Sequence, residues 1–463
     1  MGLRVSEPLA SVRVYDCPGV ELAPAIRARL DDISGMSPVR RIVGLPDIHL
    51  KPRMEAPSSL AVETDGALSA QLSSPSPNCG MAMLGIGLAA DDAEPLAGEL
   101  VPLLRAVIPQ KRSPYALSTA DTLRAMQYGM HFSADRFDEF ELSPERYDDD
   151  GRRKVPPADE LRRLIPEGYI ERARAEFGTL GGGNHFLELE KVSEVFDETA
   201  AAAYGLAVGQ SAILYHSDSG GLGYRLGRLY AHRSKVRRRY LPRMFARKVT
   251  FHASRARSPR ELVGRGKAFV IPQRFAWLPT GSTEAEDLMA AYAAGMNFAW
   301  ANRAALASAA AAAVRVVFGP VPVRLVADST HNSISWVNGS WLHRHNAARA
   351  IPAGHPEAKG ELVSLGRPIL LSGTDRSSTY VCRPGPRSSD ALFSVDHGAG
   401  GTEGVLGRDL EEGPVTRRFR YSGEEEAVRH RSDDGIESVL AVLEGAGILS
   451  RVARTTPFAV LKE

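Results

Sequence analysis

The sequence predicts an α/β fold in the broad sense, α+β included, because short apolar runs alternate with segments of helix-forming residues. The apolar runs have the length of strands, and each ends in a polar or glycine-rich break. They are 40–49, 79–88, 184–192, 211–221, 323–332, 367–375 and 391–401. Between them, 283–318 is rich in alanine and other helix formers, which predicts a long helix. Strands mixed with helices argue against a helical bundle or a β-sandwich.

The remaining segments complete the predicted organisation. Residues 98–127 have a helical pattern, and 434–463 predicts a helix followed by a strand. The polar stretches 138–166 and 251–282 contain Pro and Gly, and we expect them to be excursions from the core. No internal repeat or long low-complexity linker is evident. We therefore predict one catalytic domain over 1–463, with a basic helical or loop insertion at 224–282.

Composition predicts a soluble cytoplasmic protein. Of the 463 residues, 43% are apolar and 24% charged, which is ordinary for a globular chain. Three cysteines are too few for a disulfide framework, so a reducing compartment is expected. The N-terminus has no apolar core of a signal peptide. The most apolar window, 304–318, is interrupted by Arg315 and is too short to span a bilayer, so no membrane association is expected.

The net charge of +2 conceals one strongly basic segment. Residues 225–248 contain ten lysines and arginines and no acidic residue. Aromatic residues are interleaved with these charges, as in surfaces that follow a nucleic-acid backbone. A solvated helical face would have the same composition, so both interpretations stay open. If the segment binds RNA, the candidate contacts are Arg237, Arg238 and Arg239.

Side chains that bind metals stand at the ends of the strand-like runs. One cysteine and four histidines share this placement: Cys79, His185, His216, His331 and His397. If the strand ends meet, a thiolate and several imidazoles surround one point, and this ligand set suits a first-row transition metal. A lone histidine near a strand is more often a core or surface residue, and a lone cysteine a buried apolar one. A metal site and purely structural roles therefore both remain possible.

Three glycine-rich segments each contain one of these histidines. They are GTLGGGNH (178–185), HSDSGGLG (216–223) and HGAGGTEG (397–404). Segments with so little side-chain bulk let backbone N–H groups approach an anion such as a phosphate. Such loops are also common as plain turns. The coincidence of loop and histidine in all three favours an anion site.

Several motifs, in a fixed order, make the sequence similar to a known family. They are GLPDIH (44–49), NCGM (78–81), GTLGGGNHFLELE (178–190), HSDSGGLG (216–223), NFAWANR (297–303), THNSI (330–334), HRHNAARA (343–350), GRPILLSGTDRSSTYV (366–381), HGAG (397–400) and PFAVLK (457–462). In motif content and order the chain resembles the RtcB-type RNA ligases over nearly its whole length. The resemblance implies an RtcB-like fold, with β-sheets flanked by helices and an active site in a central cleft.

The resemblance also implies an activity. It implies a GTP-dependent RNA ligase with two Mn²⁺ ions, which joins 2′,3′-cyclic phosphate or 3′-phosphate ends to 5′-hydroxyl ends. The processes implied are tRNA splicing and RNA repair. The implied partners are RNA, as tRNA halves or broken strands, and an archease-type activator.

Roles for individual residues follow from matching positions in the family's motifs. His397 matches the histidine that receives the guanylyl group, and its small neighbours would let the nucleotide phosphate approach. The matching metal ligands are Cys79, which would bridge two ions, His185, His216 and His331. The matching GTP-site positions are Asn184, Phe186, Glu188, Thr374, Thr379, His397, Gly398, Ala399, Gly400 and Lys462. Arg344, in the HRHNAARA motif, is a further candidate RNA contact.

The sequence departs from the family's usual pattern at charged positions. Ser76 stands where the usual Asp-x-x-Cys-Gly motif has a metal-binding aspartate, and a hydroxyl is a poorer ligand for a hard divalent cation. Gly220 and Gly401 replace arginines, and His345 replaces a lysine. Asp218 replaces a glycine, which makes it a candidate for the missing carboxylate.

These departures keep two alternatives open beside ligation. The chain could be a divergent paralogue with another activity, either nucleotidyl transfer to a different acceptor or phosphoester hydrolysis. It could also be a non-catalytic, metal-containing RNA-binding protein. The retained Cys79, His397 and Lys462 argue against the last alternative, because a chain that has stopped catalysing tends to lose its nucleophile.

Overall fold

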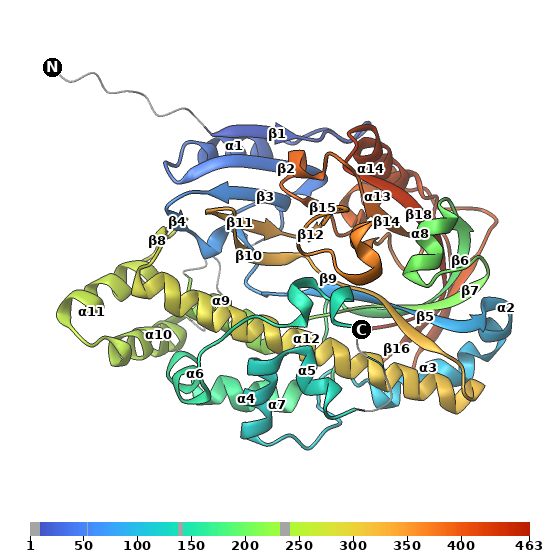
Figure 1. Ribbon diagram of the computed structural model, residues 1–463, viewed down its shortest axis with the longest axis horizontal. Coiled ribbons are helices and arrows are strands. Elements are labelled where there is room, and N and C mark those ends of the chain that lie inside the picture. Colours follow the sequence, from blue (N-terminus) through green and yellow to red (C-terminus); the bar gives the residue numbers. More distant parts are fainter. Residues whose placement is uncertain (1–9, 53, 138–140, 142, 232–240) are drawn as a thin grey trace.

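The structure is a computed structural model that describes residues 10–463, apart from 53, 138–140, 142 and 232–240. Its mixture of helices and sheets confirms the predicted fold class (Figure 1). The described residues form a nine-stranded sheet, a five-stranded sheet and two two-stranded ribbons. Neighbouring strands along the main path of the large sheet are antiparallel, so the fold is on the α+β side of the prediction.

The order of strands within each sheet differs from their order along the chain. The large sheet pairs, in turn, β13 (Ile369–Leu371), β14 (Thr379–Pro384), β18 (Leu449–Lys462), β6 (Phe186–Val195), β7 (Gln210–Ser217), β5 (Gly80–Ala89) and β9 (Val323–Thr330), with β16 (Val415–Arg420) beside β18 and β17 (Glu425–Arg429) beside β16. The five-stranded sheet pairs β1 (Ser11–Val14), β2 (Val39–His49), β3 (Ser58–Thr64), β11 (Ser340–His345) and β10 (Asn332–Val337). The ribbons pair β12 (Ala347–Arg349) with β15 (Ser394–Asp396), and β4 (Ala67–Leu68) with β8 (Leu278–Pro279).

The helices occupy the connections between these strands. They are α1 (Pro24–Ser34), α2 (Ala90–Ala93), α3 (Ala97–Val107), α4 (Thr119–Tyr128), α5 (Met130–Ala134), α6 (Ala158–Leu164), α7 (Glu167–Glu176), α8 (Glu198–Tyr204), α9 (Gly221–Leu229), α10 (Leu241–Arg255), α11 (Pro259–Arg265), α12 (Thr283–Phe318), α13 (Gly400–Leu406) and α14 (Asp434–Gly445). The predicted helix over 283–318 and the predicted helix and strand over 434–463 are confirmed.

One sequence expectation needs correction, and one segment expected to be an excursion contains helices. The single helical pattern over 98–127 forms two helices, α3 and α4, because Pro109 and Pro114 interrupt it and Ser118 caps α4 together with Asp121. The polar stretch 251–282 contains the end of α10 and all of α11, which starts at the cap Ser258. Charged surface residues kept the apolar pattern of these helices weak.

Helix α12 is the scaffold on which the large sheet and the helical layer meet. One face, including Met296 and Trp300, packs in the core of the large sheet. The other face, including Phe298 and Ala301, packs with α4, α6 and α7. The two sets alternate with the period of a helix, so α12 is buried on opposite sides. In Figure 1 it crosses the molecule between the strands and these helices.

Helix α12 is also apolar and long enough to cross a membrane by length and composition. An 18-residue window within its 36 residues reaches a mean hydropathy of 1.2. Of that window, 67% is buried inside the protein. The core helix of a folded domain has the same composition, and the packing of α12 on both faces accounts for it.

Candidate metal and nucleotide site

The large sheet brings four strand ends to one place. Strands β6, β7, β5 and β9 are consecutive neighbours and antiparallel, so the starts of β6 and β5 lie beside the ends of β7 and β9. The predicted metal ligands stand at these ends, namely Cys79 before β5, His185 before β6, His216 near the end of β7 and His331 after β9. The sheet order therefore gathers residues that are far apart in the sequence.

These four side chains are buried and in contact. Cys79 Sγ lies 3.1 Å from His216 Nε2 and 3.6 Å from His185 Nε2. The rings of His216 and His331 have centroids 5.0 Å apart. Two groups have ligand atoms within 4.8 Å of one another, namely Cys79 with His216 and His331, and Cys79 with His185 and Asp218. Both groups share the Cys79 sulfur.

The donor chemistry fits divalent metal ions. The Nδ1 atom of His185 lies 2.8 Å from the Leu180 carbonyl and donates to it, which leaves the Nε2 lone pair for a ligand. The buried Nδ1 of His331 has no hydrogen-bond partner among the described residues. Burial holds the pKa of His216 and His331 well below the usual range, so both imidazoles are neutral, as ligation requires.

His397 completes the cluster from outside the large sheet. It follows β15, and its ring centroid lies 4.3 Å from that of His331. Its Nδ1 lies 3.1 Å from the Asn346 carbonyl and donates to it, so the lone pair is on Nε2. Burial, and then the charge of Lys51, lower the pKa of His397 to about 3. This imidazole is thus neutral at physiological pH, and such a nitrogen can act as a nucleophile.

Arg303 of α12 fixes the turn that presents Cys79. Its guanidinium binds the Asp328 carboxylate through two hydrogen bonds of 2.6 Å, and both side chains are fully buried. It also donates to the carbonyl and the side-chain oxygen of Asn78, each at 2.8 Å. Only glycine fits at the first position of β5, because a Cβ on Gly80 would lie 2.6 Å from the Ser329 backbone oxygen.

Asn302 ties together two of the glycine-rich loops. Its side-chain oxygen accepts from the Gly178 N–H at 2.7 Å. Its amide nitrogen donates to the carbonyls of Thr179 and Asp218, each at 3.1 Å. The 178–185 loop and the loop after β7 are therefore held in a fixed relation. This explains the NFAWANR motif, to which sequence reasoning assigned no function.

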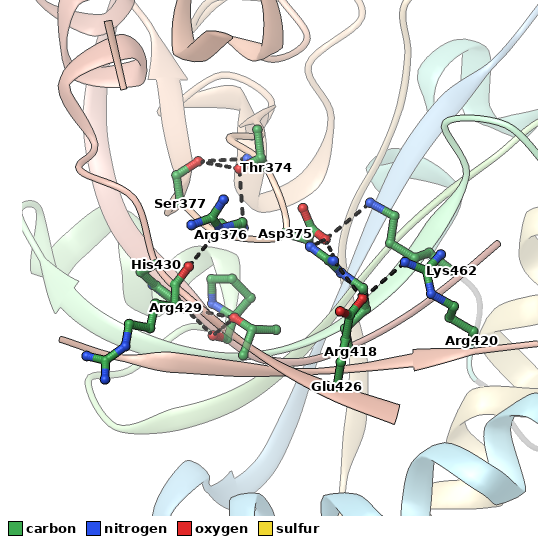
Figure 2. Close-up of polar contacts among 12 residues, drawn as sticks. Thr374, Asp375, Arg376, Ser377, Arg418, Arg420, Glu426, Arg429, His430 and Lys462 are labelled. Carbon is green, nitrogen blue, oxygen red and sulfur yellow. Dashed lines mark hydrogen bonds and ion pairs between the residues drawn. The ribbon is translucent and has the colours of Figure 1, made fainter. Parts of the chain in front are cut away.

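A second polar cluster lies along β6 and β18. Figure 2 shows Lys462 and Arg418 both directed toward the Asp375 carboxylate. The Lys462 ammonium lies 3.2 Å from Asp375 Oδ2, and the Arg418 guanidinium 2.7 Å from the same oxygen. Burial would raise the pKa of Asp375, but Lys462 and Arg418 outweigh it and hold that pKa below the usual range. Burial, and then Glu190 and Asp375, raise the pKa of the neighbouring Glu188 well above its usual range.

The other predicted GTP-site residues surround these two clusters to different degrees. Phe186 pairs with Lys462 across the β6–β18 register, and its ring centroid lies 5.7 Å from that of His216, so it links the two clusters. The Thr374 hydroxyl hydrogen-bonds to Ser377 at 3.0 Å, just before Thr379 in the same segment. Gly398, Ala399 and Gly400 follow His397 directly. Asn184 is exposed, and its side chain forms no hydrogen bond or ion pair with another described residue.

The candidate RNA contacts are less well supported. Arg237, Arg238 and Arg239 lie outside the described residues. Arg344 is 2% exposed, and its guanidinium donates to the Ser394 hydroxyl and to neighbouring carbonyls. A phosphate backbone has no access to a side chain this deep, so the prediction that Arg344 binds RNA is corrected to a structural role.

Lys51 is a functional candidate that sequence reasoning missed. It follows the GLPDIH motif two residues after His49, and its partly buried ammonium acts electrostatically on His397 and Cys79. Lys51 thus adds positive charge near both candidate residues. The position of a lone lysine after a motif was the available signal.

The site opens to a cavity of about 290 Å³. Its lining includes His185 and Asp218, with Lys111 and Arg172 among the cationic side chains. His185 and Asp218 belong to one of the two ligand groups, and both line the cavity. His216 and His331, of the other group, are not among its lining residues. The group that contains His185 and Asp218 is therefore the more accessible of the two.

Comparison with known proteins agrees with this geometry. The family model described as tRNA-splicing ligase RtcB matches residues 30–463. The RNA-splicing ligase RtcB of Mycobacterium tuberculosis is 27% identical over 454 residues, covering 92% of this chain and 97% of the relative. The tRNA-splicing ligase RtcB of Thermococcus kodakarensis is 28% identical over 416 residues, covering 83% of this chain and 80% of the relative. With a match that covers residues 30–463, the chain belongs to the RtcB family.

Proposed function

We propose that this chain is a GTP- and manganese-dependent RNA ligase that joins 2′,3′-cyclic phosphate or 3′-phosphate ends to 5′-hydroxyl ends. The observation that carries the proposal is the neutral His397 imidazole, oriented through Nδ1 beside a buried cluster of metal ligands. Relatives named as RNA-splicing and tRNA-splicing ligases support ligation as the reaction. We propose RNA in tRNA splicing or repair as the substrate, the cytoplasm as the location and an archease-type protein as a candidate activator.

The proposed reaction starts at His397. Its Nε2 attacks the α-phosphorus of GTP, the bond to the β-phosphate oxygen breaks, and pyrophosphate leaves. The Asn346 carbonyl holds the Nδ1 proton of the guanylylated ring. The guanylyl group then passes to an RNA 3′-phosphate, and the 5′-hydroxyl of the second RNA displaces GMP. A cyclic phosphate is first opened by water.

Two Mn²⁺ ions, held by Cys79 with the three histidines and an oxygen ligand, would offset the charge on the phosphate oxygens. The protein's own side chains provide the rest of the environment. Lys51 adds positive charge beside His397. A purine edge can be recognised at the second polar cluster, away from the reacting His397. The donors and acceptors there belong to Lys462, Asp375 and Glu188.

Self-guanylylation tests this proposal. Protein incubated with α-labelled GTP and Mn²⁺, without RNA, is expected to acquire an acid-labile and alkali-stable label. His397→Ala should abolish the label, whereas His131→Ala, which changes a histidine on α5 outside the cluster, should retain it. No label with Mn²⁺, Co²⁺ or Zn²⁺, while metal remains bound, would contradict ligation. That result would favour phosphoester hydrolysis or RNA binding without catalysis.

Lys462→Met is expected to weaken GTP binding about tenfold or more, because a charged hydrogen bond to a ligand contributes about 1.5–3 kcal/mol. Divalent-ion binding should not change, since Lys462 is not in either ligand group. GTP affinity by isothermal titration calorimetry checks this. Lys191→Met is the matched control, because Lys191 lies on β6 but pairs with Asp91 at the surface. Equal GTP affinity in the Lys462 variant and the wild type would remove Lys462 from the nucleotide site.

A further inference from the structure

Asp218 occupies the position of an oxygen ligand in the second group of metal-binding side chains. Its carboxylate lies within 4.8 Å of the Cys79 sulfur and a His185 ring nitrogen, and all three residues are buried. The loop after β7 fixes this orientation, because the Gly220 N–H donates to Asp218 Oδ1 at 2.7 Å. Asn302 holds the Asp218 carbonyl from the other side. The side chain is thus directed into the ligand group by its own backbone.

Ser76 contacts the same carboxylate. The Ser76 side chain is close enough to act on the Asp218 carboxylate, and it lowers the pKa of Asp218 against the effect of burial. Ser76 stands three residues before Cys79, where the resemblance to the family implies a metal-binding aspartate. The carboxylate that lies near Cys79 and His185 in this chain comes from the loop after β7 instead of the loop before β5.

Asp218 forms no close ion pair with a lysine or arginine of the described residues, although the charge of the more distant Arg303 acts on its carboxylate. Asp218 is 8% exposed. A buried carboxylate without a counter-charge is costly unless a cation is present. The nearby Arg172 and Arg225 both form ion pairs with Glu176. A divalent cation between Cys79, His185 and Asp218 would supply the missing charge.

We propose that Ser76 and Asp218 have exchanged roles. Asp218 is the carboxylate ligand of the outer divalent cation, which is the ion held with Cys79 and His185, and Ser76 orients this carboxylate. The inner ion is the one held by Cys79, His216 and His331. The inference deepens the proposed metal-dependent function and rests on it. A thiolate, an imidazole and a carboxylate form a ligand set for a first-row divalent ion. His185 and Asp218 line the cavity of about 290 Å³, so an ion that they held would be accessible to a phosphate ligand.

Metal stoichiometry tests the exchange of roles independently of RNA ligation. Purified protein stripped of metal is titrated with Mn²⁺, and bound metal is counted by elemental analysis after gel filtration. The wild type is expected to bind two ions, and Asp218→Asn one ion, or a second one about 100-fold more weakly. Glu176→Gln is the matched control, because Glu176 lines the same cavity and also accepts a backbone N–H, from Gly221 at 2.8 Å. It should bind two ions.

Two further variants distinguish metal coordination by Asp218 from a purely structural role of this side chain. The double change Ser76→Asp with Asp218→Gly restores the family's usual arrangement and should restore the second ion. Asp218→Cys should keep two sites but shift the outer one toward Cd²⁺ over Mn²⁺ by about tenfold or more, because a thiolate is a softer ligand. Both readouts use folded protein that still binds the inner ion, so they hold even if Asp218→Asn is unstable.

Three outcomes would overturn the exchange. If Asp218→Asn and the wild type bind two ions with equal affinity, Asp218 is not a metal ligand. The proposal of RNA ligation through His397 would still stand. If Asp218→Cys leaves the preference between Cd²⁺ and Mn²⁺ unchanged, the side chain at 218 does not reach the ion. If the wild type binds no divalent ion, the exchange and the metal-dependent function fail together.

Discussion

Cys79→Ser is expected to abolish binding of both divalent ions at once. The Cys79 sulfur is shared by the two ligand groups, at 3.1 Å from His216 Nε2 and 3.6 Å from His185 Nε2. A neutral hydroxyl can neither carry the negative charge of a thiolate nor bridge two cations as effectively. Every step that needs metal should therefore stop, including the proposed transfer of the guanylyl group to His397.

Thermal unfolding with and without Mn²⁺ measures this effect. A ligand at 100 times its Kd stabilises the native state by about 2.7 kcal/mol per site, so the wild type should show a clear rise in Tm with Mn²⁺. Cys79→Ser should show none. Cys382→Ser is the control, since Cys382 is also buried but lies on β14 in another part of the core. A metal-dependent rise in Tm for Cys79→Ser would show that the sulfur does not connect the two sites.

The sequence was sufficient to predict the members of the site but not their grouping. Cys79, His185, His216 and His331 were recognisable because each stands at the end of an apolar run. Their division into two groups depends on the strand order β6-β7-β5-β9, which does not follow the sequence. Local patterns specify strands and their ends, whereas the order of strands is decided by packing between distant segments.

Burial decides which predicted roles the fold permits. Arg344 was a reasonable RNA contact by charge, but it pairs with carbonyls inside the protein. A basic side chain in the sequence does not reveal whether its charge is used inside the fold or at the surface. Lys51 shows the opposite case, because a lysine after a motif becomes part of the site only through the path of the chain after β2. The single-domain organisation and the insertion at 224–282 stay predictions.

The NFAWANR motif illustrates why a family signature need not contain ligands. Asn302 and Arg303 act on the backbone around the candidate ligands, where they position the loops that present Cys79 and Asp218. A helix buried on two sides is a rigid support for such contacts. The geometry of the candidate metal site therefore depends on polar residues of α12.

Arg303→Met is expected to destabilise the protein by about 3–5 kcal/mol, because it leaves the carboxylate of Asp328 buried without its partner. The midpoint of urea unfolding, together with the slope of the transition, measures the loss. Arg383→Met is the control, because Arg383 pairs with Asp197 at 3.3 Å with its side chain 39% exposed, and such surface pairs contribute about 0–1 kcal/mol. A loss no larger than that of the control would mean that Asp328 is stabilised in another way.

The double variant Arg303→Met with Asp328→Leu distinguishes the effect of Arg303 on the stability of the fold from its effect on the position of Cys79. Replacing both charges with apolar groups removes the unpaired carboxylate, so most of the lost stability should return. The Asn78 carbonyl and side chain would still lack their two hydrogen bonds of 2.8 Å, and the turn before Cys79 would lose its support. Mn²⁺ affinity should therefore stay reduced in a protein that unfolds near the wild-type midpoint. Recovery of both properties together would show that Arg303 acts on the fold alone, and that Cys79 is positioned by the strands of the sheet.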